Sequence, residues 1–196
     1  MMLNQDAQNL LFRAAHTTYG FTDEPVSDET VQAVYDLVKY GPTAMNSQPL
    51  RIVLVRSDEA RERVRAHMGE GNKPKIGKAP LVALLAADLD FHEELPKVFP
   101  IKPDAAAQYA ADEAGRVAAA RFNAAIQTGY FIVGARAAGL AAGPMAGFDA
   151  DGLSKEFFPD GDHHVIAVVN LGHAAEADAH FPRQPRLAFD EVVTSV

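Results

Sequence analysis

The sequence contains no cysteine among its 196 residues. This absence excludes disulfides, thiolate metal sites, iron–sulfur clusters and a cysteine nucleophile. Stability must therefore come from burial of apolar side chains. Hydrophobic residues make up 48% of the chain, which is enough for one good core or two small ones.

Long hydrophobic runs and an excess of positive charge are also missing. The N-terminal residues lack the basic start and apolar run of a secretory signal. The most apolar stretch, 122–135, contains Asn123 and Gln127, lies between Arg121 and Arg136, and is shorter than the roughly 20 residues of a membrane span. A net charge of −8 argues against a nucleic-acid or membrane-surface partner. We expect a cytoplasmic protein that binds neither.

Several familiar site motifs are absent as well. The sequence has neither the G-x-G-x-x-G dinucleotide fingerprint nor a G-x-S-x-G nucleophile elbow. The stretch GNKPKIGKA has five residues between its glycines, and Ala79 stands where a P-loop needs Ser or Thr. His163 and His164 would face opposite sides of a strand and could not chelate one ion. We therefore expect no metal site, and no carboxylate pair stands out.

Helix and strand signals alternate along the chain. Ser27 and Ser57 are helix N-cap candidates. After Ser27, Val31, Val34, Leu37 and Val38 recur at helical spacing before Gly41 and Pro42 end that helix. The pattern predicts strands at 51–56, 81–87 and 164–171, and helices at 58–71 and 112–140, the last as one helix or two in tandem with Gly129 and Gly134 allowing close packing. The fully apolar run 81–87 is typical of a central strand covered on both faces. This alternation indicates an α/β or α+β layered domain.

Two segments stand apart from this pattern. Residues 89–111 carry three prolines with aromatic residues between them and are long for a connector, as functional lids often are. The tail 173–196 has apolar residues but no obvious core of its own. We expect this tail to dock on another surface.

Four polar patches are the candidates for function. They are the connector 41–49 (GPTAMNSQP), the basic loop with Asn72, Lys73, Lys75 and Lys78, the arginines Arg183 and Arg186 beside prolines, and the glycine-rich stretch 139–147. Each one alone also fits an ordinary turn, solvated lysines, a surface tail or a helix cap. Together they suit a polar heterocycle with a phosphate. Because no side chain for covalent or acid–base chemistry accompanies them, a cofactor would carry the chemistry.

The order of these patches resembles the nitroreductase family of FMN enzymes. GPTAMNSQP is similar to the family signature P-S/T-S/A-x-N-x-Q-P, and GNKPK, AAGLAAGPMAGFD, NLG and a PR-x-P-R tail follow in family order over nearly the whole chain. The resemblance implies one α+β domain spanning residues 1–196. Its fold would have three layers, with a central mostly antiparallel sheet flanked by helices and a C-terminal tail exchanged between subunits. It also implies a homodimer with FMN at the subunit interface.

The resemblance also implies roles for particular residues. Thr43, Asn46 and Gln48 would contact the isoalloxazine and ribityl groups, and Asn72 and Lys75 the polar edge of the flavin. Ala146 and Gly147 would offer backbone N–H groups to N5 and O4, while Arg183 and Arg186 would hold the phosphate. The family's N-terminal R-S-x-R-x-F phosphate clamp is replaced here by HTTYGF, which leaves His16 and Thr17 as donors and no arginine.

By this resemblance the chain is an FMN-dependent oxidoreductase that takes hydride from NADH or NADPH. Its stretches EPVSDE, EELPKVFP, GPMAGFD and FPRQPRL are similar to the branch that contains malonic semialdehyde reductase. A nitroaromatic or quinone is the alternative acceptor. Arg121 is the candidate cation for a carboxylate substrate, with a surface or helix-pairing role as its ordinary alternative. The competing interpretation of the whole chain is a flavin- or small-ligand-binding module without turnover.

Overall fold

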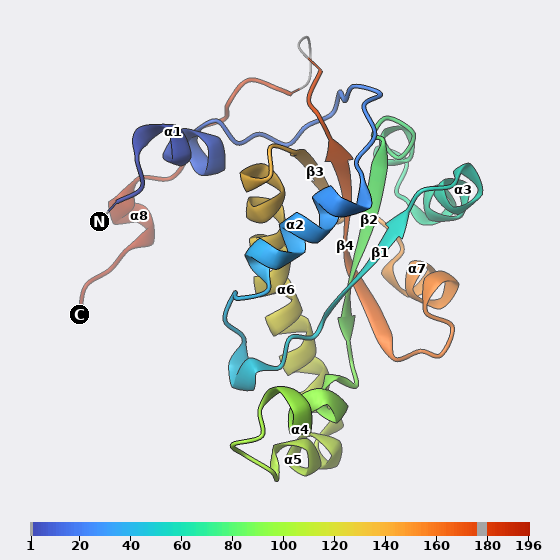
Figure 1. Cartoon of the computed structure of the whole chain (residues 1–196), viewed down its shortest axis with the longest axis vertical. Coiled ribbons are helices and arrows are strands. Elements are labelled where there is room, and N and C mark those ends of the chain that lie inside the picture. Colours follow the sequence, from blue (N-terminus) through green and yellow to red (C-terminus); the bar gives the residue numbers. More distant parts are fainter. Residues whose placement is uncertain (1, 176–179) are drawn as a thin grey trace.

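A four-stranded antiparallel sheet forms the middle of the structure, a computed structural model that describes residues 2–175 and 180–196. The strands β1 (Leu50–Val55), β2 (Leu81–Asp88), β3 (Ala141–Met145) and β4 (His163–Gly172) lie in the order β1-β2-β4-β3. Helices α2 (Asp28–Val38) and α6 (Glu113–Ala137) cover one face, and α3 (Asp58–His67) and α7 (Ala150–Phe157) cover the other (Figure 1). The α+β, three-layer arrangement that the resemblance implied is confirmed, and the α/β alternative is wrong.

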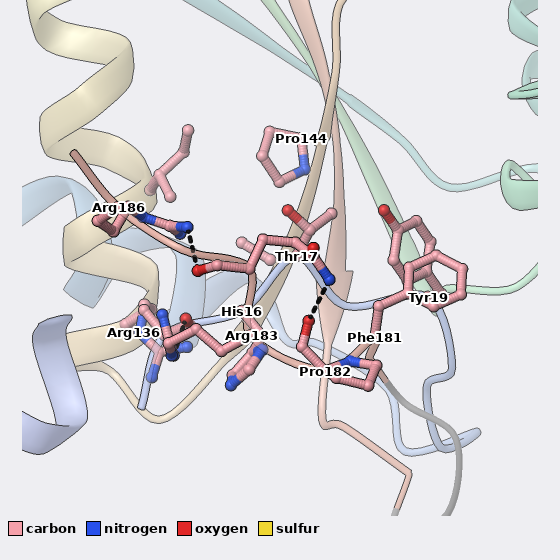
Figure 2. Close-up of a pocket in the computed structure, with 13 residues that line it drawn as sticks. His16, Thr17, Tyr19, Arg136, Pro144, Phe181, Pro182, Arg183 and Arg186 are labelled. Carbon is pink, nitrogen blue, oxygen red and sulfur yellow. Dashed lines mark hydrogen bonds between the residues drawn. The ribbon is translucent and has the colours of Figure 1, made fainter. Parts of the chain in front are cut away.

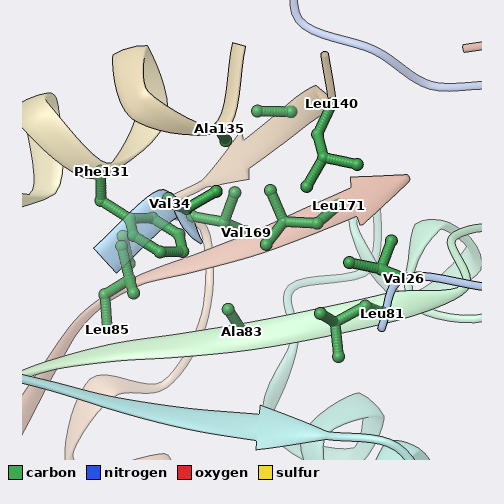
Figure 3. Packing of buried hydrophobic residues seen from close by; sticks show 12 residues of the cluster. Val26, Val34, Leu81, Ala83, Leu85, Phe131, Ala135, Leu140, Val169 and Leu171 are labelled. Carbon is green, nitrogen blue, oxygen red and sulfur yellow. The ribbon is translucent and has the colours of Figure 1, made fainter. Parts of the chain in front are cut away.

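Strand β2 is the centre of the core. All eight of its residues are buried, as the apolar run 81–87 predicted. Because strand side chains alternate, its odd-numbered residues pack with Val34 and Phe131 on the α2/α6 side (Figure 3). Its even-numbered residues pack with Val64 and Leu153 on the α3/α7 side. One strand thus joins two hydrophobic clusters.

The helices begin at side-chain caps. The Ser27 and Ser57 hydroxyls accept the N–H groups of Thr30 (3.2 Å) and Ala60 (3.1 Å), which confirms both predicted starts. The charged helix is shorter than the predicted 58–71. It ends at His67, because Met68 is buried and pairs with Phe148 in an isolated β-bridge.

The predicted helix 112–140 is one helix, α6. The Asp112 carboxylate accepts the Gly115 N–H at 2.9 Å at its start. At its end, Gly139 adopts φ +81°, a value that favours glycine, and the chain turns into β3. The prediction that this stretch is helical is confirmed, and the helix cap that was the ordinary alternative for the glycine-rich stretch is present at Gly139.

Strand β3 was not predicted, since its residues were assigned to a glycine-rich stretch. It carries Gly143 and Pro144 and lies at the edge of the sheet, the position where proline is tolerated. The N-terminal segment before α2 explains why residue 143 is a glycine. Thr18 donates its N–H to Ala142 O (3.0 Å), and a Cβ at Gly143 would lie 2.5 Å from Thr18 O. Tertiary contacts thus make a strand from residues of low strand propensity.

The segment 89–111, which the sequence marked as a long connector of the kind that forms lids, is largely helical. It contains the short helices η4 (Phe91–Glu94), α4 (Leu95–Val98) and α5 (Ala105–Ala111). Phe91, Leu95 and Ala105 are buried in a third hydrophobic cluster with residues of α6. This segment is therefore a packed helical layer at one end of the sheet (Figure 1).

The two ends of the chain lie together beside the sheet. The N-terminal α1 (Gln5–Gln8) and η1 (Asn9–Arg13) lie near the short C-terminal α8 (Phe189–Val192), away from the strands (Figure 1). Every residue of 180–196 is exposed. Six of them have large apolar side chains that would normally be buried: Phe181, Leu187, Phe189, Val192, Val193 and Val196.

The two helix glycines provide a test of the packing. A Cβ at Gly134 would overlap Val38 Cγ1 where α6 crosses α2, whereas a Cβ at Gly129 would meet nothing within 4 Å. The prediction that glycine allows close packing is therefore confirmed at Gly134. It is wrong for Gly129 within one chain. We expect Gly134→Ala to lower the free energy of unfolding by about 1–3 kcal/mol through overpacking. Denaturant unfolding would measure this change.

Gly129→Ala is the matched control for that measurement. It makes the same chemical change on the same helix without a clash, and alanine favours the helix by about 0.5–1 kcal/mol. We expect it to leave stability unchanged or to raise it. Equal losses at the two positions would contradict the packing explanation.

Candidate functional site

The connector 41–49 has a strained backbone. Met45, Asn46 and Gln48 have φ values of 53°, 51° and 46°, and they are the non-glycine residues with positive φ in the described part of the chain. Such conformations cost of order 1–3 kcal/mol each and persist where surrounding contacts enforce them. Backbone strain of this kind is typical of functional sites.

Two polar side chains of α6 enforce this conformation. Asn123 Oδ1 accepts the Ala44 N–H at 2.8 Å, and Gln127 Oε1 accepts the Leu50 N–H at 2.9 Å. In the sequence these two residues served only to interrupt an apolar stretch. Their place in the fold shows that they fix both ends of the 3₁₀ turn η2 (Ala44–Asn46) and its exit into β1.

The predicted residues of the connector lie together. The Gln48 N–H donates to Thr43 Oγ1 (3.2 Å), and Gln48 Nε2 donates to Asn46 O (3.2 Å). Asn46 Nδ2 donates to Val98 O (2.8 Å), which ties the connector to α4. Thr43, Asn46 and Gln48 line a surface depression of about 540 Å³ together with Lys39.

The basic loop meets the end of β3. Asn72 Nδ2 donates to Gly147 O (3.0 Å), and Lys75 Nζ donates to Asn72 Oδ1 (2.8 Å). A Cβ at Gly147 would lie 2.8 Å from Asn72 Nδ2, so glycine permits this close approach. Ala146, the neighbour of Gly147, is exposed. Four predicted site residues are thus brought together: Asn72, Lys75, Ala146 and Gly147.

Arg61 and Asn170 hold the basic loop in place. The Arg61 guanidinium donates to the carbonyls of Ile76, Ala79 and Pro80 at 2.6–3.2 Å. Asn170, buried on β4, donates from Nδ2 to Lys75 O at 2.7 Å. These contacts anchor both sides of the 3₁₀ turn η3 (Lys73–Lys75).

A cavity of about 380 Å³ is lined by the remaining predicted cofactor-binding residues. It lies between the N-terminal segment, the end of α6, β3 and the tail, and its lining includes His16, Thr17, Arg183 and Arg186 (Figure 2). Arg183 Nη2 donates to Arg13 O and Ala15 O, both at 2.7 Å, and so fastens the tail to the N-terminal segment.

Arg136, at the end of α6, lines the same cavity and was not predicted as a site residue. Its Nε and Nη2 donate to Leu10 O at 2.8 and 2.6 Å. In the sequence its only signal was a cation in the last turn of a helix, where cations are common. Its hydrogen-bond acceptor Leu10 lies 126 positions away and Arg183 lies in the tail, so local sequence gave no reason to select it.

The cavity is strongly cationic in an acidic protein. Its lining carries three guanidinium groups and one imidazole, and no carboxylate appears among its described lining residues. Desolvation and then the charge of Arg183 lower the pKa of Arg136. Desolvation, followed by the charges of His180 and Arg183, lowers the pKa of His16, whose ring stacks on His180 at 3.8 Å. Such a donor set suits a phosphate or a similar anion.

Tyr19 links the cavity to the basic loop. Its ring lies 5.0 Å from Lys75 Nζ and 5.0 Å from the centre of the Phe181 ring, and it lines the cavity itself. The cavity, the basic loop and the end of β3 therefore form one continuous surface. The connector is separate: it is bonded to the middle of α6, whereas the tail lies near the C-terminal end of that helix (Figure 1).

Arg121 is not joined to either part. It is exposed on α6 and lines a shallow depression with Glu113 and Val117. Its charge lowers the pKa of His164, after the larger effect of desolvation. The role of Arg121 in binding a carboxylate substrate therefore stays a prediction.

Residues 2–175 and 180–196 hold no cluster of three or more histidine, aspartate or glutamate side chains arranged to bind a metal ion. None of the helices in that part of the chain combines the length and apolar character that a bilayer crossing needs.

A family model and similar proteins all point to the nitroreductase family. A family model described as Nitroreductase family matches residues 12–173. A Streptomyces coelicolor protein named as a candidate NADH dehydrogenase/NAD(P)H nitroreductase is 61% identical over 196 residues, which cover 100% of this chain and 99% of that protein. A Ralstonia nicotianae protein of the same name is 48% identical, with 92% of each chain covered.

Solved structures share the fold at low identity. The crystal structure of a candidate nitroreductase from Bacillus subtilis matches with a TM-score of 0.87 at 20% identity, covering 98% of this chain and 100% of that one. A candidate nitroreductase from Exiguobacterium sibiricum, solved in complex with FMN, matches with a TM-score of 0.83 at 15% identity, covering 100% and 99%.

Proposed function

Because the chain belongs to the nitroreductase family, we propose that it is an FMN-dependent oxidoreductase that uses NADH or NADPH as electron donor. The observation that carries the proposal is the cationic cavity, continuous with the basic loop and with the end of β3. When bound, FMN would supply the redox chemistry, taking hydride from the nicotinamide and passing electrons to a small acceptor. The residues found in the site need only bind and orient these molecules.

The donor set fits FMN. The doubly charged phosphate would be held in the cavity by Arg183 and Arg186, with His16 and Thr17 as further donors. Asn72 and Lys75 would face the polar edge of the ring, where a cation favours the reduced anion. Ala146 and Gly147 would present the backbone of the strand end to the same ring.

We further propose that residues 1–196 act as one domain in a homodimer. The connector with Thr43, Asn46 and Gln48 lies apart from the cavity within one chain, so the connector of the partner subunit would complete each site. The exposed apolar side chains of the tail supply a surface for exchange between subunits. A cytoplasmic setting belongs to the same proposal, because NADH and NADPH are made and oxidised inside the cell.

The acceptor is the finer part of the proposal. We infer a small aldehyde of the malonic semialdehyde type, or a nitroaromatic or quinone, with Arg121 as the candidate cation for a carboxylate. The runner-up is a flavin-binding module without turnover. Anaerobic addition of NADH or NADPH to the yellow protein separates the two: we expect bleaching, followed by recovery of colour with an acceptor. Recovery no faster than with oxygen alone would favour the module.

Arg186 provides a direct test of the phosphate assignment. We expect Arg186→Ala to weaken FMN binding roughly 10- to 150-fold, because a charge-assisted hydrogen bond is worth about 1.5–3 kcal/mol. Titration of the apoprotein with FMN would measure the change. An affinity that stayed within about threefold of the unmodified protein, a margin of about 0.7 kcal/mol, would refute the assignment.

A further inference from the structure

Arg136 has neither a carboxylate partner nor a full set of backbone acceptors for its guanidinium among the described residues. It is half-buried, yet no carboxylate lies within ion-pair distance among the described residues. Two exposed arginines of α3, Arg63 and Arg65, pair instead with Glu156 and Glu62, and the half-buried Arg61 of the same helix donates to three backbone carbonyls. A half-buried charge is unfavourable unless a counter-ion, a ligand or several hydrogen-bond acceptors balance it, and Arg136 has only the one acceptor, Leu10 O, in the described part of the chain.

The bonds that Arg136 makes leave part of its guanidinium available. Nε and Nη2 both donate to Leu10 O, which fixes the plane of the group. A guanidinium has five N–H donors, so both hydrogens of Nη1 and one of Nη2 remain without an acceptor among the described residues. Figure 2 shows Arg136 on the same side of the cavity as Arg183 and His16.

The neighbouring charges point to the same need for an anion. Arg136 and Arg183 are close enough that the charge of Arg183 lowers the pKa of Arg136. Two like charges held together by carbonyl contacts repel each other, and an anion placed between them relieves that repulsion. Arg183 approaches from the tail and Arg136 from α6, so an anion held by both would also join the two elements.

We propose that Arg136 is a phosphate-binding residue of the cofactor site and that it also positions the N-terminal segment through Leu10 O. This inference rests on the proposed function, since the phosphate in question is that of FMN. It assigns the end of α6, a rigid element, as the fixed wall of the phosphate site. Arg183 and Arg186 would close on it from the tail.

The test compares FMN with riboflavin, which has the same ring but no phosphate. Apoprotein carrying Arg136→Gln would be titrated with each flavin and followed by quenching of flavin fluorescence. Glutamine loses the charge but can still donate to Leu10 O. We expect FMN binding to weaken about 10-fold or more, while riboflavin binding stays within about threefold.

Two further variants sharpen the result. Arg136→Lys keeps the charge but loses the two-pronged contact, so its loss for FMN should be smaller than that of the glutamine variant. Arg65→Gln removes the same charge from an exposed pair on α3, and we expect both flavins to bind it as they bind the unmodified protein. Circular dichroism of each apoprotein would verify folding.

Three other outcomes would contradict the inference. Equal weakening of FMN and riboflavin in both Arg136 variants would show a purely structural role and overturn the inference. Unchanged FMN binding in Arg136→Gln would overturn it too, while leaving the proposed function intact. Failure of the unmodified protein to bind FMN at all would overturn the proposed function and this inference with it.

Discussion

Deletion of residues 180–196 is expected to abolish both the dimer and the bound flavin. The tail carries Phe181 and Phe189, which are 69% and 76% exposed within one chain, with further apolar residues between and after them. Side chains of this size are seldom left in water unless a partner covers them. The same segment carries Arg183 and Arg186. Sedimentation and the visible absorption spectrum of the purified protein would measure the two losses.

A matched variant separates the two roles of the tail. Full-length protein with Arg183→Ala and Arg186→Ala keeps every apolar side chain, so we expect it to remain dimeric while losing most of its FMN. A shorter deletion of residues 194–196 removes only the very end and should change neither property. A protein truncated at residue 179 that still sedimented as a yellow dimer would refute this account of the tail.

Much of the fold follows from local sequence. The apolar run 81–87 identified the central strand, because a short run of this kind is typical of a strand covered on both faces. Ser27 and Ser57 identified two helix starts, because the cap is a contact between residues three positions apart. These features depend on short-range chemistry, which the sequence displays directly.

The features that were missed depend on contacts between distant segments. Strand β3 contains Gly143 and Pro144, which are poor strand formers, and it exists because β4 and Thr18 pair with it. The helices of 89–111 share a cluster with α6 that no local pattern reveals. Arg136 gains its significance only when the N-terminal segment and the tail meet at the end of α6.

The connector 41–49 combines a feature that local sequence indicated with one that depends on a distant segment. Its prolines and amides indicated a fixed, polar, ligand-facing turn, and the positive φ values of Met45, Asn46 and Gln48 agree with a turn held under strain. The clamps that hold it, Asn123 and Gln127, come from the middle of α6. Their spacing of four residues places both on one face of that helix, which is a signal the sequence did contain.

Ala146→Pro is expected to slow reduction by NADH or NADPH sharply while the protein still binds FMN. We predict that the backbone N–H of Ala146 faces N5 of the flavin, and a fixed backbone donor at that atom would both orient the ring and tune it. Proline lacks this hydrogen. The methyl group of Ala146 is exposed, so replacing the side chain alone should have little effect. Stopped-flow reduction under anaerobic conditions would measure the rate.

Ala146→Ser and Ala146→Glu are the controls, because both keep the N–H and change only the exposed side chain. We expect their reduction rates to stay near that of the unmodified protein. Proline also restrains the backbone where Ala146 O accepts the Phe148 N–H at 3.2 Å, so all rates must be expressed per bound flavin. An Ala146→Pro protein that bound FMN and was reduced at the unmodified rate would place the N5 donor at another residue.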